Sequence, residues 1–176
     1  MLLRRINAII SLLTTVFLLN YAIRISVWML SGGSVEQSSP IASWVLVGLM
    51  ALHAFISIYF AVCSLDDGER RKIKSYPKMN GATIFQRASG LLLILFTALH
   101  VASVMGAMKL PEIAIAVLFP IFFTIALAHT AISTGKAFIT LGIGNAKLIK
   151  GVNAAMGLIC AATLVADIVG FYLYVC

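Results

Sequence analysis

Long apolar runs alternate with short polar breaks along this chain. A helix needs about 20 mostly apolar residues to cross a bilayer, and five runs meet that length. They cover residues 6–30, 41–64, 85–107, 111–142 and 151–175. The polar breaks fall at residues 31–40, 65–83, 109–111 and 142–150. We therefore predict an all-α protein, an integral membrane bundle of five transmembrane helices that forms a single domain over residues 1–176.

The composition excludes a soluble protein. Hydrophobic residues make up 61% of the chain and charged residues 11%, whereas soluble domains are about 45–50% apolar and about 25% charged. A domain of this size keeps much of its surface exposed, so the apolar excess has to face lipid. Cys63, Cys160 and Cys176 are widely spaced in apolar sequence. That pattern supports neither a metal site nor a disulfide framework.

Basic residues gather on one side of the predicted bundle. The chain has thirteen basic and six acidic residues, and eleven of the thirteen fall on the side of the N-terminus. These eleven are Arg4, Arg5, Arg70, Arg71, Lys72, Lys74, Lys78, Arg87, Lys136, Lys147 and Lys150, and the other two are Arg24 and Lys109. Because cytoplasmic loops are rich in lysine and arginine, we expect a cytoplasmic N-terminus, an outside C-terminus and a multi-pass protein of the cytoplasmic (inner) membrane. No basic stripe interleaved with aromatic residues points to nucleic acid.

Ionisable side chains within apolar spans are costly and mark functional positions. His53 lies 13 residues before Asp66, and His129 lies 13 residues before Gly142. At about 1.5 Å per residue, both lie roughly 20 Å from the cytoplasmic ends of their helices. Two imidazoles at one depth, with no carboxylate or thiolate nearby, fit the axial ligands of a haem iron. The alternative for each is a hydrogen bond to a neighbouring helix.

A second polar group is expected nearer the outer face. His100 lies 13 residues after Arg87 on a helix that runs outward, and Tyr21, Arg24 and Asp167 reach a similar depth. No second histidine reaches this level. We predict an outer polar cluster of these four side chains, one that lacks a bis-histidine pair.

Three stretches of the chain carry a resemblance to a known family. They are residues 53–65 (HAFISIYFAVCSL), residues 86–90 (QRASG) followed by His100, and His129 with residues 138–142 (FITLG). Together they resemble the cytochrome b membrane-anchor subunit of succinate dehydrogenases and fumarate reductases, of the kind with five helices on a single chain. The similarity covers about residues 45–145, is weaker in the first span and is almost absent in the fifth.

The resemblance implies haem b as the cofactor. In that family, helices two and four bind the haem nearer the iron–sulfur subunit, and His53 and His129 match those ligands. Helices one and three bind an outer haem. His100 matches the helix-three ligand, but Tyr21 stands at the helix-one position. Since a tyrosinate ligand would place an anion in lipid, we expect one haem, with two as the alternative. The glutamate that some members carry just before the helix-four histidine is absent, since Leu127 and Ala128 stand there.

The resemblance also implies a respiratory complex. A flavoprotein (FAD) subunit and an iron–sulfur subunit would dock on the cytoplasmic face, and this chain would pass electrons between the iron–sulfur subunit and membrane quinone (menaquinone or ubiquinone). Basic residues at 70–78 and 136–150 suit such docking, or binding to anionic lipid headgroups. The candidates to bind haem propionates or a cytoplasmic-side quinone are Gln86, Arg87, Ser89 and Lys136. The resemblance makes the outer cluster either a distal haem site or a quinone site, where Arg24 paired with Asp167 is expected either to serve a quinol or to join two spans.

Two other classes of protein remain open from the sequence. One is a haem-free membrane anchor or assembly subunit whose histidines only pack helices. The other is a small transporter, which is less consistent because only Pro120 interrupts the interior of a span.

Overall fold

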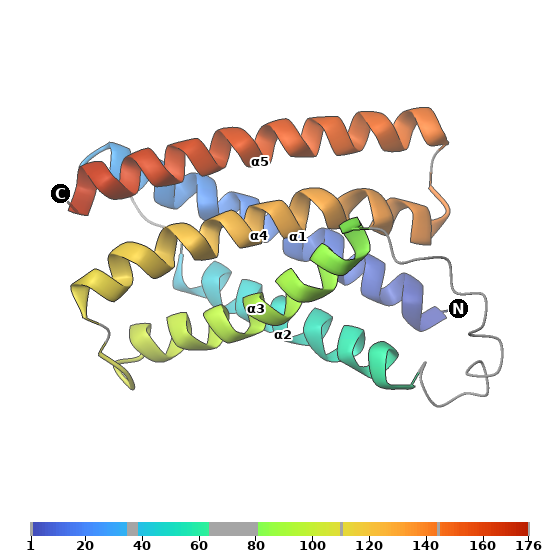
Figure 1. Cartoon of the computed structure of the whole chain (residues 1–176), viewed down its shortest axis with the longest axis horizontal. Coiled ribbons are helices and arrows are strands. Elements are labelled where there is room, and N and C mark those ends of the chain that lie inside the picture. The colour runs from blue at the N-terminus through green and yellow to red at the C-terminus, as the bar shows by residue number, and fades with distance from the viewer. Residues whose placement is uncertain (1, 35–38, 64–80, 110, 144, 176) are drawn as a thin grey trace.

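The computed structural model describes residues 2–34, 39–63, 81–109, 111–143 and 145–175. Within this part of the chain the structure is all-helical, with five helices (Figure 1). They are α1 (Leu2–Leu30), α2 (Pro40–Cys63), α3 (Gly81–Val104), α4 (Glu112–Leu141) and α5 (Ala146–Val175). Each contains a segment long and apolar enough to cross a membrane. The chain is therefore a multi-pass membrane protein, as its hydropathy pattern predicts.

Local sequence explains where the helices begin and end. After α1, Gly32 and Gly33 take positive φ angles of 63° and 82°, a region that side-chain-bearing residues avoid. Pro111 precedes α4 with an extended backbone, and Gly142 closes α4 in the left-handed conformation with φ 74°. The Asn145 side chain accepts a hydrogen bond from the Leu148 N–H (3.0 Å) and caps α5.

Helices α1 and α5 are longer than the sequence pattern indicates. The first begins at Leu2 instead of residue 6, and the fifth begins at Ala146 instead of residue 151. Both extensions are polar turns rich in arginine or lysine, which are good helix formers. They extend the helix beyond the apolar run, since hydropathy reports only the part that lies in lipid.

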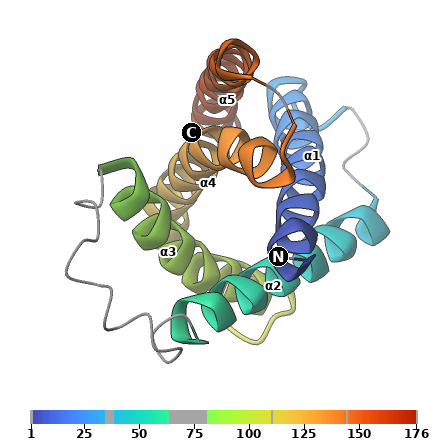
Figure 2. The ribbon, with the colours of Figure 1, turned by 90° about the vertical axis from the view of Figure 1, so that its right-hand side faces the viewer.

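Four helices form a ring, and the fifth lies outside it. In Figure 2, which views the bundle end on, α1, α2, α3 and α4 follow one another around a common axis. Neighbouring helices in this ring approach each other closely, whereas among the described residues no such backbone approach occurs across its diagonals, between α1 and α3 or between α2 and α4. Helix α5 packs against α1 and α4 from outside. The two termini lie at opposite ends of the bundle (Figure 1), and which end faces the cytoplasm stays a prediction.

The fifth helix is held by close backbone approach and by a buried acid. A Cβ placed on Gly170 would lie 3.1 Å from the Met29 Cβ, so glycine permits this approach of α5 to α1. Beside it, the Ser26 hydroxyl is hydrogen-bonded to the Asp167 carboxyl group, and Asp167 is only 1% exposed. Helix α5 therefore supports the ring from outside, and the ring is where the histidines lie.

Candidate functional site

His53 and His129 lie on diagonally opposed helices of the ring at similar depth. His53 precedes the end of α2 at Cys63, and His129 precedes the end of α4 at Leu141. With a rise of about 1.5 Å per residue, the two lie roughly 15 and 18 Å from the end of the bundle that holds the N-terminus. They are close enough to interact electrostatically. We call this the inner level.

The His53 ring is oriented by α1. Its Nδ1 lies 3.0 Å from the Asn7 Oδ1 atom, and the Asn7 Nδ2 group donates to the Ser57 hydroxyl at 3.2 Å. Because the Asn7 amide nitrogen is engaged with Ser57, its oxygen faces the histidine and can only accept a hydrogen bond. The proton of His53 therefore resides on Nδ1, and the lone pair is left on Nε2.

The His129 ring is oriented in the same way by α3. Its Nδ1 lies 2.8 Å from the Ser89 hydroxyl oxygen, and that hydroxyl lies 2.6 Å from the Phe85 carbonyl oxygen. A hydroxyl has one proton, and the carbonyl oxygen can only accept it. With that proton donated to the Phe85 carbonyl oxygen, Ser89 accepts a hydrogen bond from His129, and this ring is then protonated on Nδ1. A Cβ on Gly90 would lie 3.4 Å from the His129 Cε1 atom, so the ring packs directly on the α3 backbone.

This pattern of hydrogen bonds suits metal ligation. A histidine that binds a metal through Nε2 usually donates its Nδ1–H to an oxygen acceptor, which fixes both the tautomer and the ring orientation. Asn7 and Ser89 act in this way on His53 and His129, and no described residue is hydrogen-bonded to either Nε2. The described residues contain no cluster of three or more His, Cys, Asp or Glu side chains that could bind a metal ion. A haem iron needs only two axial ligands.

Polar side chains continue from His129 toward the N-terminal end of the bundle. Gln86 donates to the Ser133 hydroxyl at 3.0 Å, and the Lys136 ammonium donates to the Gln86 amide oxygen at 2.5 Å. Arg87 is exposed and within electrostatic range of Lys136. The four candidates Gln86, Arg87, Ser89 and Lys136 thus lie together beside His129 on α3 and α4. A basic, hydrogen-bonding corner of this kind suits a haem carboxylate or a quinone oxygen.

An apolar layer separates the inner level from the other half of the ring. Leu18, Leu46, Leu93 and Ala126, one residue from each ring helix, are buried against one another. On α2, Leu46 lies between the start of the helix and His53. On α3, Leu93 lies between the start of the helix and His100. Two distinct polar levels result.

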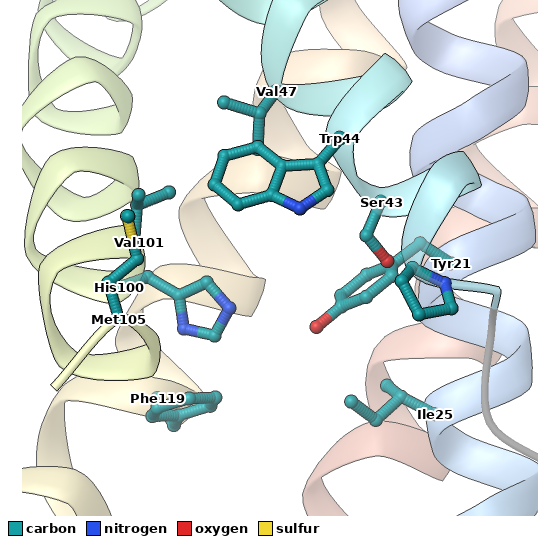
Figure 3. A pocket seen from close by; sticks show the side chains of 10 residues that line it. Tyr21, Ile25, Ser43, Trp44, Val47, His100, Val101, Met105 and Phe119 are labelled. Carbon is teal, nitrogen blue, oxygen red and sulfur yellow. The ribbon is translucent and has the colours of Figure 1, made fainter.

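The outer level contains a cavity of about 440 Å³ with His100 and Tyr21 on opposite walls. Figure 3 shows the Tyr21 hydroxyl directed across the cavity toward the His100 ring, with Trp44 and Phe119 on the other sides. His100 packs edge-on against Phe119, with ring centres 5.3 Å apart, and stacks on Phe122 at 6.2 Å. Neither His100 nor the Tyr21 hydroxyl is hydrogen-bonded to a described residue. The structure thus places Tyr21 and His100 at one site.

Arg24 and Asp167 do not join this site. Arg24 is exposed and makes no hydrogen bond or ion pair with a described residue. Asp167 is buried between α5 and α1, where it is hydrogen-bonded to Ser26, and it acts on Tyr21 only electrostatically, without lining the cavity. The expected pair of Arg24 with Asp167 is therefore wrong for this structure. The two positions share a depth, but they point to different faces of the bundle, and residue counting along a helix does not give the face.

The sequence analysis missed three polar partners, Asn7, Ser57 and Ser133. Ser57 and Ser133 each follow a histidine by four residues, and so lie on the same helix face as His53 and His129. That spacing is a signal that could have found them. Asn7 interrupts an apolar run, but nothing in the sequence pairs it with α2.

Comparison with protein-family models, curated proteins and solved structures finds no match to this chain.

Proposed function

We propose that this chain is the haem b-containing membrane anchor of a succinate:quinone oxidoreductase, either a succinate dehydrogenase or a fumarate reductase. It passes electrons between an iron–sulfur subunit and membrane quinone, and carries out no succinate chemistry itself. The observation that carries the proposal is the inner level. His53 and His129 lie on diagonal helices at one depth, each with Nδ1 hydrogen-bonded to an oxygen acceptor of the next helix in the ring.

In this proposal His53 and His129 would hold the haem iron through their Nε2 atoms. Haem b, when bound, supplies a one-electron centre within the bilayer. Asn7 and Ser89 orient the two histidines, since the oxygen of each accepts a hydrogen bond from a histidine Nδ1–H group. Lys136 and Arg87, with Gln86 between α3 and α4, supply positive charge and hydrogen bonds for the propionates on the N-terminal side.

Partner subunits would dock at the end of the bundle that holds the N-terminus. Lys147 and Lys150 are exposed at the start of α5, and Arg4 and Arg5 are exposed at the start of α1. The charged segment at 70–78 lies outside the described residues. A basic surface at this end attracts acidic patches of a soluble iron–sulfur subunit and also anionic lipid headgroups. Docking of the flavoprotein follows from docking of its iron–sulfur partner.

The test is haem content in the purified complex. The pyridine haemochrome of the wild-type protein is expected to give one haem b per chain, and the absorption spectrum of the intact complex is expected to be that of a low-spin bis-histidine haem. His53→Ala and His129→Ala are each expected to remove it. His100→Leu is the matched control. It removes a histidine from the same four-helix ring but from its outer level, and leaves His53 and His129 in place. Full haem content in His53→Ala would show that the ligand assignment is wrong.

A haem-free anchor or assembly subunit is the second candidate, because hydrogen bonds such as those of His53 to Asn7 and His129 to Ser89 also join helices that bind no cofactor. A single measurement, the haem content per chain, distinguishes the two candidate functions. Zero haem per chain in a protein purified with its partner subunits would favour the second and exclude the first.

A further inference from the structure

The cavity of the outer level has the chemistry of a ligand site without charge. Its volume is about 440 Å³, within the range of small-molecule pockets. The walls are mostly aromatic and aliphatic, Tyr21 and His100 face each other across the cavity, and the Ser43 hydroxyl lies beside Tyr21 (Figure 3). No lysine, arginine, aspartate or glutamate is among the described residues that line it. Asp167 acts on Tyr21 electrostatically but lies behind the lining, hydrogen-bonded to Ser26. An ion would therefore find no counter-charge in the described walls, which is costly in a membrane interior.

A second haem does not fit these residues. The iron would need Tyr21 as its second axial ligand in place of histidine, and that ligand would be a phenolate anion. Haem also brings two propionates, and the described lining offers no cation to pair with them. At the inner level Asn7 and Ser89 fix the histidine tautomers, whereas His100 packs on two phenyl rings and has no hydrogen-bond acceptor among the described residues. The outer level lacks each of the features that suit the inner level to haem.

We propose instead that the Tyr21–His100 cavity binds the ring of a quinone or hydroquinone. Such a ring is flat, uncharged and carries an oxygen at each end. The Tyr21 hydroxyl can hydrogen-bond one oxygen and the His100 ring the other, while Trp44 and Phe119 provide aromatic contacts. The choice of a quinone among uncharged ring compounds rests on the proposed function, but the binding does not require haem at the inner level.

The two tryptophans of the chain make a direct test. Trp44 lines the cavity, while Trp28 packs on Tyr174, with ring centres 4.5 Å apart, where α1 meets α5. In Trp28→Phe the fluorescence comes from Trp44 alone, and in Trp44→Phe it comes from Trp28 alone. Titration of the purified full-length chain in detergent with decylubiquinone is expected to quench Trp44 saturably, with one site per chain. Quenching of Trp28 is expected to rise without saturation, since it reports only quinone dissolved in the micelle.

Two side-chain variants, made in the Trp28→Phe background, identify the site. Tyr21→Phe and His100→Leu each remove one hydrogen-bonding group, and loss of one hydrogen bond is expected to weaken binding roughly three- to ten-fold. Tyr172→Phe, an exposed tyrosine on α5, is the matched control and should bind as the parent does. If His100→Leu does not fold, Tyr21→Phe still tests the proposal, since it removes a single oxygen atom.

Several outcomes would overturn this inference. Quenching of Trp44 that never saturates, or that is the same in Tyr21→Phe and its parent, would exclude a quinone site in this cavity. A second haem per chain that His100→Leu removes would assign the cavity to haem. Haem content at the inner level is measured separately, so a chain without haem that still binds quinone at Trp44 would refute the proposed haem site and leave this site standing.

Discussion

The two polar levels of the ring use the same residue type in opposite ways. At the inner level, His53 and His129 are held by oxygen acceptors from neighbouring helices. At the outer level, His100 is held by two phenyl rings and faces a cavity. An imidazole whose Nδ1 proton is already accepted presents a fixed lone pair, which suits a metal. An imidazole whose two nitrogens have no hydrogen-bond partner among the described residues can donate from one and accept at the other, which suits a neutral hydrogen-bonding ligand. The surroundings of a histidine, more than its presence, separate the two kinds of site.

The largest expected effect comes from pushing His129 off the α3 backbone. Gly90→Leu places a bulky side chain where a Cβ alone would lie 3.4 Å from the imidazole, so we expect nearly complete loss of haem by pyridine haemochrome. Gly90→Ala adds only that Cβ and should retain most of the haem. Gly48→Leu is the control, because nothing lies within 4 Å of a Cβ at that position. Equal haem in Gly90→Leu and Gly48→Leu would contradict the packing of His129 on α3.

The next effect is the loss of the acceptor for His53. Asn7→Leu removes the oxygen that holds the Nδ1 proton, and loss of such a partner lowers metal affinity about 10–100-fold. The rate at which haem transfers from the complex to added apomyoglobin measures this loss of affinity. The change also leaves a polar N–H unpaired between helices, so the free energy of unfolding in detergent should fall by about 1 kcal/mol. Asn20→Leu replaces an exposed asparagine of the same helix and should change neither quantity.

A smaller effect is expected from Ser89→Ala. This change removes the hydrogen bond that His129 makes at 2.8 Å, whereas Asn7→Leu removes the side-chain partner of both His53 and Ser57. We therefore expect haem affinity to fall about tenfold, the lower end of the 10–100-fold range. The same transfer to apomyoglobin measures it, with Ser103→Ala on α3 as the control. A loss as large as that of Asn7→Leu would contradict this ranking.

The smallest effect is expected from making the two levels alike in sequence. Tyr21→His supplies an imidazole opposite His100, so residue type alone would give a second axial pair. We expect haem content to stay at one per chain, because the described lining of the cavity has no cation for propionates and no acceptor that fixes His100. Pyridine haemochrome decides this, and two haems per chain would show that the ligand pair is sufficient.

The sequence predicts the depth of each polar residue well and its partners poorly. Tyr21 and His100 were expected at one depth and share one cavity, and Gln86, Ser89 and Lys136 were expected near His129 and lie beside it. Depth follows from counting residues along a helix of fixed rise. The expected partnership of Arg24 with Asp167 fails because it required a helix face as well as a depth.

The sequence alone determined that five helices are long and apolar enough to cross a membrane, because a continuous apolar run of about 20 residues satisfies its own backbone hydrogen bonds in lipid only as a helix. Only the tertiary structure decided which helices are diagonal, that Asn7 meets His53, and that α5 lies outside the ring. The physical reason is that lipid and a helix interface are about equally apolar. Hydrophobic patterning, which reveals the inner face of a helix in a water-soluble protein, therefore does not reveal it here, and the rotation of each helix is set by packing.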